Sequence, residues 1–277
     1  MLQLPFRALP SLCDTHYMRI ASLQPSITLT LKHLGQLDTL CACTKYCLEV
    51  VPELHDRKIK ILHDSWTANT EEILAAKPDL VIASVPYRME SLAAILKTGL
   101  PILTLAPHTL EDIYKDTRIL ASVVNAQAAG EAIIREMQSA IANVRETTAK
   151  LPNKKIYCEE WGKPLIHSQH WVAELIEAAG GTFVGLPGAH TDAETIATAA
   201  PDILLFAWCG AGDRVPLARI IEQRSWQNLS AVTNKKVFCI PDEYLNTPAI
   251  TLLDGLHCIA HALHPQLFPK HPRLIQL

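Results

Sequence analysis

A segment of this chain occurs twice, once in each half, and this repeat constrains the fold more than any other feature. Residues 71–83 (EEILAAKPDLVIA) are echoed by residues 194–206 (ETIATAAPDILLF). In both copies a glutamate stands eight positions before an aspartate that follows a proline. Each copy predicts a short helix, a Pro-Asp turn and a strand, so we expect two similar α/β lobes with matching carboxylates at equivalent places.

The properties of proline explain the expected turn. Proline lacks an amide hydrogen, and its ring disfavours helical backbone at the residue before it, so Lys77 and Ala200 are expected to end their helices. The apolar runs that follow, residues 80–83 and 203–207, are typical of strands covered on both faces, as in a parallel sheet. A helix-Pro-Asp-strand connection is also common in α/β proteins generally, so the repeat alone leaves coincidence open.

Length and composition agree with two α/β lobes and exclude several classes of protein. The chain has 277 residues, of which 49% are hydrophobic, so it can bury a sizeable core. No apolar run approaches the roughly 20 residues that a membrane-spanning helix needs, so we expect a protein that is not embedded in a membrane. The net charge is only -3 and the basic residues are scattered, which argues against a nucleic-acid partner.

Strands alternate with helices along most of the chain, which favours a parallel sheet in each lobe. The pattern predicts strands at 19–23, 39–43, 80–84, 102–105, 155–159, 203–207 and 236–240, and helices at 26–34, 89–97, 171–179 and 251–263. Ser26 is the expected N-cap of the first helix, and Gly35 is its expected C-terminal stop.

The middle of the chain predicts how the lobes are connected. Residues 111–150 contain few helix breakers, so we expect one long helix preceded by a shorter one. An apolar stripe at helical spacing supports this prediction: Ile133, Met137, Ile141 and Val144. The predicted organisation is an N-terminal α/β lobe, a connecting backbone helix and a C-terminal α/β lobe, at residues 18–118, 119–150 and 151–277. The expected fold class is therefore α/β, with two Rossmann-like lobes, central parallel sheets and one long backbone helix.

Several local sequences, in their order and spacing, resemble the cobalamin and iron-chelate family of substrate-binding proteins that serve bacterial ABC importers. They are residues 19–26 (RIASLQPS), the segment around Trp66 with residues 77–81 (KPDLV), and residues 261–265 (HALHP). The resemblance covers roughly residues 18–268. It implies a helical-backbone, class III periplasmic-binding-protein fold in which a non-catalytic protein holds its ligand between two lobes.

The resemblance is closest to the vitamin B12-binding members, and it implies roles for three residues. Trp66 matches a tryptophan of their ligand cleft. Glu71 and Glu194 match the surface glutamates with which each lobe docks on arginines of the importer's membrane subunits. Both glutamates are also ordinary first-turn helix acids, since a carboxylate there favours the helix dipole. The docking hypothesis is therefore supported beyond this only by the equal spacing of each glutamate from the aspartate of its repeat.

The candidate ligand-binding residues follow from topology, because ligands of open α/β sheets bind beyond the carboxyl ends of the strands. The loops there contain Gln24, Ser26, Tyr46, Cys47, Trp66, Tyr87, Arg88, Glu160, Trp161, His167, Trp208, Cys209, Arg214, Asp242 and Glu243. Aromatic walls with a few polar groups suit a large, flat, partly apolar ligand. The predicted ligand is a tetrapyrrole, with cobalamin or another corrinoid first and haem or another iron chelate next. Alternatively, Trp161 and Trp208 are core aromatics near strand ends.

Three cysteines near the second predicted strand support a rival interpretation, a protein that binds a metal or a metal chelate. Strand alternation places Cys41 and Cys43 on one face, with Cys47 in the following loop. Thiolates and imidazoles bind soft or borderline metals, so Cys47, His167 and Cys209 are the candidate ligands, with His167 as an axial cobalt ligand. Against this, the spacing is not a standard zinc pattern, and free cysteines often behave as small buried hydrophobes.

A second rival interpretation is an enzyme that uses Cys209, Asp242 and Glu243 as nucleophile, acid and base. The sequence contains no P-loop, nucleophile elbow or GxGxxG motif, so we expect no catalysis.

Residues 1–17 lack an apolar core of signal-peptide length, and the eight cysteines are irregularly spaced. As written, the chain predicts a monomeric cytoplasmic protein that stores, carries or senses its ligand. A start further upstream would instead predict a periplasmic protein.

Overall fold

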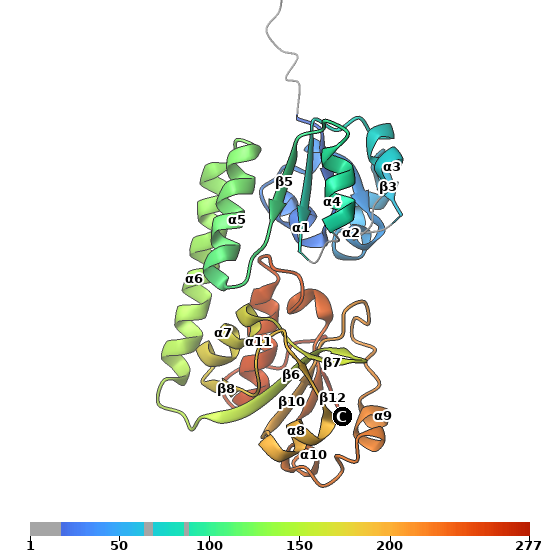
Figure 1. Ribbon diagram of the computed structural model, residues 1–277. Helices are drawn as coiled ribbons and strands as arrows, with labels where there is room; N and C mark the ends of the chain where they lie inside the picture. The colour runs from blue at the N-terminus through green and yellow to red at the C-terminus, as the bar shows by residue number, and fades with distance from the viewer. Residues whose placement is uncertain (1–17, 64–68, 86–88) are drawn as a thin grey trace, which may run out of the picture.

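The computed structural model describes residues 18–63, 69–85 and 89–277, which form two α/β lobes beside a pair of long helices (Figure 1). The helices of the described residues are α1 (Pro25–His33), α2 (Lys45–Val50), α3 (Thr70–Ala75), α4 (Met89–Leu96), α5 (Leu110–Val123), α6 (Gln127–Thr148), α7 (His170–Ala178), α8 (Ala193–Ala199), α9 (Leu217–Gln223), α10 (Ser230–Thr233) and α11 (Leu252–Leu263). The predicted α/β class with two lobes is confirmed.

The first lobe contains a parallel sheet in the order β3-β2-β1-β4-β5. Its strands are β1 (Ile20–Ser22), β2 (Leu40–Thr44), β3 (Lys60–Leu62), β4 (Leu80–Ser84) and β5 (Ile102–Leu105). The sequence did not predict β3, which is short and exposes Lys60 and Ile61. The order of connection reverses beside β1, and such a switch point is where open α/β sheets bind ligands.

The sheet of the second lobe has the predicted parallel centre, and antiparallel strands that the sequence did not predict extend its edges. Its strands are β6 (Lys154–Gly162), β7 (Leu165–His167), β8 (Gly181–Phe183), β9 (His190–Thr191), β10 (Ile203–Phe206), β11 (Val237–Cys239) and β12 (Ile275–Gln276). The central strands β8, β6, β10 and β11 are parallel. The edge strands β7, β9 and β12 pair in antiparallel fashion, because β7 returns directly from β6 as a hairpin and β12 is a short addition at the other edge.

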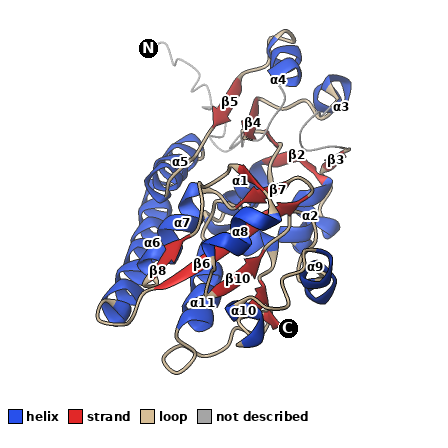
Figure 2. Ribbon diagram, turned by 60° about the horizontal axis from the view of Figure 1, so that its bottom comes forward, coloured by secondary structure: helices blue, strands red, loops and turns tan. Residues whose placement is uncertain are grey.

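Helices α5 and α6 lie side by side along one flank of both lobes (Figure 2). The backbone breaks between them at Asn125, whose φ of 55° is left-handed, so the long helix begins at Gln127 and not at residue 119. Ile133, Met137 and Ile141 are buried as the stripe predicted. They belong to a hydrophobic core that contains residues of both lobes, so α6 connects the lobes through packing as well as through the chain.

The repeated segment has the same structure in both lobes. Helix α3 ends at Ala75 and helix α8 at Ala199, and the residues before the two prolines, Lys77 and Ala200, have left-handed φ values of 49° and 48°. These residues therefore leave the right-handed helical region, as the following prolines require. The repeat is thus a shared way of ending a helix one turn before a strand.

The aspartates of the repeat also have matching partners. The Oδ2 atom of Asp79 accepts a hydrogen bond from the Arg19 amide at 2.8 Å, and that of Asp202 accepts one from the Lys155 amide at 2.8 Å. Each carboxylate thereby fixes the chain where the neighbouring strand begins, β1 in one lobe and β6 in the other. Among the described residues, no helix combines the length and apolar character needed to cross a membrane.

Candidate ligand-binding site between the lobes

The carboxyl end of the first sheet faces the second lobe. Glu174 of α7 reaches across and accepts a hydrogen bond from the Leu110 amide, the first residue of α5 after β5, with an N–O distance of 2.6 Å. Pro248, in the loop between β11 and α11, lines a small cavity together with Ser26 and Ser84 of the first lobe. The loop between β5 and α5 and the segment around Pro248 therefore lie at the junction of the lobes.

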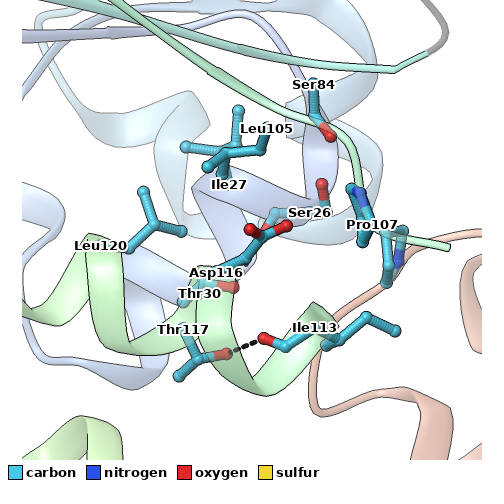
Figure 3. A pocket seen from close by; sticks show the side chains of 11 residues that line it. Ser26, Ile27, Thr30, Ser84, Leu105, Pro107, Ile113, Asp116, Thr117 and Leu120 are labelled. Carbon is cyan, nitrogen blue, oxygen red and sulfur yellow. Dashed lines mark hydrogen bonds between the residues drawn. The ribbon is translucent and has the colours of Figure 1, made fainter. Parts of the chain in front are cut away.

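That cavity is built around Asp116 of α5 (Figure 3). Its volume is about 10 Å³, the room that one water molecule needs. The Asp116 carboxylate points into it, toward the side chains of Ser26 and Ser84. Burial, with a contribution from the nearby Asp112 carboxylate, raises the pKa of Asp116 to about 6. Ser26, predicted from the sequence, lines this cavity, whereas Asp116 was not predicted, because it lies on a helix and not in a loop after a strand.

The second lobe contains a fully buried carboxylate, Glu159, near the end of β6. Arg224 binds it in bidentate fashion, with N–O distances of 2.7 and 2.8 Å, and the Tyr157 hydroxyl also donates to it. Trp208 Nε1 donates to Glu159 Oε1 at 2.8 Å. The Glu159 side chain is 0% exposed and that of Arg224 is 11% exposed, so the pair is desolvated and relies on these partners.

This buried network holds the indole of Trp208 in place. The ring also packs against Gly162, where an added Cβ would lie only 2.3 Å from Trp208 Cζ2. Trp208 remains partly exposed after β10. Trp161 in the neighbouring β6–β7 hairpin is 43% exposed, and its Nε1 donates to the Lys163 carbonyl at 2.8 Å. Trp161 is therefore a surface aromatic with a fixed ring and not a core residue.

A second group of polar side chains lies beside these aromatics. Gln169 Nε2 donates to Glu160 at 2.7 Å, and the Cys209 thiol points at the same carboxylate at 3.8 Å. Burial raises the pKa of Glu160, and burial together with Glu160 raises the pKa of Cys209. Asn246 donates to Cys209 and to the Ala207 carbonyl. Glu160 and Cys209, both predicted from sequence, are brought together here, whereas Gln169 was missed.

The remaining predicted residues of the second lobe mostly stabilise loops. Asp242 accepts hydrogen bonds from the amides of Gly210 and Gly212, both at 2.8 Å, and so fixes the loop that follows Trp208. Glu243 binds Arg273, and Arg214 is exposed with its Nε on the Ala211 carbonyl.

His167 is only 3% exposed, between the rings of Tyr157 and Phe183. Gly185 closes over it, since an added Cβ would lie 2.3 Å from His167 Cε1. Burial lowers the pKa of this histidine. Its enclosure argues against the predicted role as an axial cobalt ligand. Within the described residues, no three His, Cys, Asp or Glu side chains gather as a metal site requires, so the metal-ligand hypothesis for Cys47, His167 and Cys209 gains no support.

In the first lobe, the predicted residues divide between surface and interior. Tyr46 is partly exposed beneath the Lys45 ammonium, whereas Gln24 and Ser26 are mostly buried. Cys47 belongs to α2 and not to a loop as predicted, and it is 0% exposed, so it does not face a ligand at the surface. Helix α1 begins at Pro25 after an N-cap at Gln24, which corrects the prediction of Ser26 as the cap.

Strand β2, which carries Cys41 and Cys43, has an irregular register. Ile20 pairs with Leu40, but the next residue, Ala21, pairs with Ala42, so Cys41 is an extra residue in β2. Cys41 packs in one hydrophobic cluster and Cys43 in another. The prediction that both share one face is therefore wrong, because a bulge reverses the alternation.

Three predicted residues, Trp66, Tyr87 and Arg88, lie outside the described residues. Glu71 and Glu194 are exposed second residues of α3 and α8, so they occupy matching positions in the two lobes.

Comparison with known proteins places this geometry in a family. The family model described as periplasmic binding protein matches residues 20–244. The chain belongs to the periplasmic binding protein family. Among the relatives of this family member is an uncharacterized ABC transporter substrate-binding lipoprotein, YvrC of Bacillus subtilis, 21% identical over 91% of this chain and 82% of the relative.

Two solved structures of periplasmic binding proteins illustrate the likeness. The periplasmic vitamin B12 binding protein BtuF of Vibrio cholerae is 25% identical, with a TM-score of 0.73 over 90% of this chain and 97% of BtuF. A periplasmic heme binding protein from Pseudomonas aeruginosa is 16% identical, with a TM-score of 0.82 over 94% of this chain and 97% of that protein. The resemblance found in the sequence and the helical-backbone fold are thus confirmed, whereas the absence of catalysis stays a prediction.

Proposed function

We propose that this periplasmic binding protein is the non-catalytic ligand-binding component of an ABC importer and that it binds cobalamin or a related corrinoid between its lobes. The observation that carries the proposal is the pair Trp161 and Trp208 at the carboxyl end of β6 and β10, next to Glu160. Both rings are held by hydrogen bonds at their Nε1 atoms, so little side-chain freedom is lost when a flat macrocycle stacks on them. The likeness to a vitamin B12 binding protein at 25% identity supports the same ligand class.

The polar groups favour a corrinoid over haem. The periphery of a corrinoid carries neutral amides, whose N–H groups donate to a carboxylate and whose oxygens accept from a protonated one. Glu160 serves in either form, and burial, the largest influence on it, raises its pKa. A haem propionate is anionic, and the ionised form of Glu160 would repel it.

The importer role gives the two lobes a shared partner. Glu71 and Glu194 are exposed at the same position of the repeated helices, and we propose that both dock on the membrane subunits. An importer role requires a location outside the cytoplasmic membrane. Of the two locations considered from the sequence, it therefore agrees with the periplasmic one. Substitution of either glutamate by alanine is expected to abolish importer binding while leaving the Kd for the ligand unchanged.

Calorimetric titration with cyanocobalamin and hydroxocobalamin tests the ligand assignment. We expect saturable binding at micromolar or tighter Kd and a loss of about tenfold, or about 1.4 kcal/mol, in Trp161→Ala. Leu186→Ala is the matched control, because Leu186 is likewise an exposed large apolar residue, but 71% exposed and outside the site. The absence of heat and of any spectral change with both corrinoids would refute the assignment. Saturable binding of haemin in that case would move the assignment to iron chelates.

A further inference from the structure

A second pocket lies where helices α5, α6 and α7 meet on one flank of the molecule (Figure 2). Its volume is about 420 Å³, which is within the range of pockets that hold small molecules. None of its lining residues belongs to the group around the two fixed indoles, so the pocket is separate from the proposed ligand site. All three helices contribute charged or polar side chains to it: Glu111 and Tyr114 from α5, Arg145 from α6, and Glu174 and Glu177 from α7.

The first turns of α5 separate this pocket from the cavity at Asp116. Glu111 and Tyr114 are three positions apart and therefore share one face of the helix. Ile113 and Asp116 are also three positions apart, and they line the other cavity. The two cavities have no lining residue in common, so they lie on different sides of α5.

Tyr114 is the feature of the pocket that points to a bound molecule. The residue is only 6% exposed, yet no hydrogen bond joins its hydroxyl to any residue that the structure describes. Buried tyrosine hydroxyls usually have a hydrogen-bond partner. The hydroxyl is not sealed off, because the fully enclosed side-chain atoms without a partner in the described part of the chain are His167 Nδ1 and Asn246 Oδ1. It is therefore reached through the pocket that Tyr114 lines, and it offers an oxygen there.

Most of the charges in the pocket are unpaired. The side chains of Glu111, Arg145 and Glu177 are exposed and make no hydrogen bond or ion pair with residues of the described ranges. Glu174 uses its Oε2 atom, which accepts from the Leu110 amide. The pocket thus contains three carboxylates and one guanidinium, and this excess of negative charge attracts cations.

Apolar residues form another part of the wall. Leu110 and Ile141 line the pocket and are only 8% and 5% exposed, and Ala142 lies beside them on α6. Such a wall suits an alkyl chain better than a hydrated metal ion. The described residues also contain no group of three acidic, histidine or cysteine side chains that could hold a metal. The pocket therefore favours an organic cation.

We propose that this pocket is a second ligand site, which binds a small organic cation with a primary ammonium at the end of an alkyl stem. An ammonium group has three N–H donors and no acceptor, and the carboxylates of the pocket and the Tyr114 hydroxyl supply oxygens for them. The alkyl stem packs on Leu110 and Ile141. An aliphatic diamine and a basic amino acid share this chemistry, and they differ in the carboxylate that Arg145 binds only in the amino acid.

The position of the pocket gives binding a structural consequence. Helix α7 belongs to the second lobe, whereas α5 follows the last strand of the first sheet. Glu174 already connects the two helices through the Leu110 amide. A ligand that contacts α5 and α7 adds a second connection, so it is expected to raise the Tm of the protein. The proposal does not depend on the ligand between the lobes.

Calorimetric titration of the purified full chain with cadaverine, lysine and norleucine tests the proposal. Cadaverine is lysine without its carboxylate, and norleucine is lysine without its side-chain ammonium. We expect saturable binding of cadaverine or lysine with a Kd of about 1 mM or tighter, and binding of norleucine at least about tenfold weaker.

Two substitutions locate the site. Tyr114→Phe removes only the hydroxyl oxygen and is expected to weaken binding about fivefold. Glu177→Gln removes one exposed charge and is expected to weaken binding about two- to fivefold. Glu136→Gln is the matched control and is expected to leave the Kd unchanged, because Glu136 is an exposed glutamate of α6 outside the pocket.

Arg145→Ala separates the two sources of the cation. If the ligand is a basic amino acid, lysine binds more tightly than cadaverine and loses affinity in this variant. If the ligand is a diamine, cadaverine binds more tightly than lysine and gains affinity, because a like charge is removed. Either pattern supports the second site.

The absence of saturable heat with cadaverine and with lysine up to about 10 mM would overturn the proposal. So would binding that neither Tyr114→Phe nor Glu177→Gln weakens, or binding that norleucine matches. The wild-type titrations decide the proposal even where a variant fails to fold, and circular dichroism identifies such a variant. They are performed without corrinoid, so a failure of the corrinoid assignment leaves the result unaffected.

Discussion

Substitution of Arg224 by methionine tests the argument that a buried charge pair fixes the second lobe. Methionine keeps much of the volume but removes both hydrogen bonds to Glu159, whose side chain is 0% exposed. The carboxylate then retains only the Tyr157 hydroxyl and the Trp208 indole as charge-stabilising donors. Removal of one partner from a buried ion pair is expected to reduce the free energy of unfolding by about 3–5 kcal/mol.

The partner substitution separates the missing charge from the missing contacts. Glu159→Gln keeps the shape of the side chain but leaves the Arg224 guanidinium without its carboxylate partner. Arg224 is 11% exposed and reaches some water, so a smaller loss of unfolding free energy, about 1–3 kcal/mol, is expected. The double variant contains no unpaired buried charge. Its loss is therefore expected to be smaller than the sum of the two single losses by about 2 kcal/mol.

Urea unfolding followed by tryptophan fluorescence measures the loss of unfolding free energy in the second lobe, which contains Glu159 and Arg224. Four of the five tryptophans, Trp161, Trp171, Trp208 and Trp226, lie in the second half of the chain, so the signal reports mainly on the second lobe. Circular dichroism at the same urea concentrations reports on both lobes. A loss below about 1 kcal/mol in Arg224→Met, or strictly additive losses in the double variant, would refute the reasoning.

Three further substitutions test other parts of the structure. The pKa of Asp116 is raised from 3.8 to about 6, so the free energy of unfolding should fall as pH rises through that window. Asp116→Asn should remove this pH dependence and raise the free energy of unfolding at pH 7 by about 1–2 kcal/mol, a value that allows for the partial exposure of Asp116. Urea titrations across pH measure both effects. Gly162→Ala should displace the Trp208 ring, cost about 1–3 kcal/mol and shift the tryptophan emission; an unchanged spectrum would contradict the packing. Glu174→Gln should lower stability by about 1 kcal/mol through weaker binding of the Leu110 amide, and an unchanged Tm would argue against this bridge.

Features with a local physical cause were predictable from the sequence. The Pro-Asp turns, the buried strands that follow them and the long helical stripe each arise from residues within a few positions of one another. The prediction of β4 matches the structure at both ends, because Pro78 and the apolar run from Leu80 define its start. The same reasoning found both copies of the repeat, although it did not show that Asp79 and Asp202 fix the neighbouring strands.

Features that depend on distant residues were not predictable. Glu159 and Arg224 are 65 positions apart, and nothing near Arg224 in the sequence indicates a buried partner. A glutamate inside an apolar strand was nevertheless a usable signal, since charged residues are rarely buried unless paired. The bulge at Cys41 is similar, because the register of β2 is set by its pairing with β1 and not by its own sequence.

The fold determines where a ligand lies but not which ligand it is. A vitamin B12 binding protein and a heme binding protein share this arrangement of lobes, so the two sheets and α6 do not distinguish between such ligands. Discrimination must come from the loops after the strands. In this chain the described loops offer two fixed indoles and a carboxyl whose pKa is raised by burial, and the corrinoid proposed above depends on these groups. Binding specificity should therefore respond to Glu160→Gln more than to any substitution in the sheets.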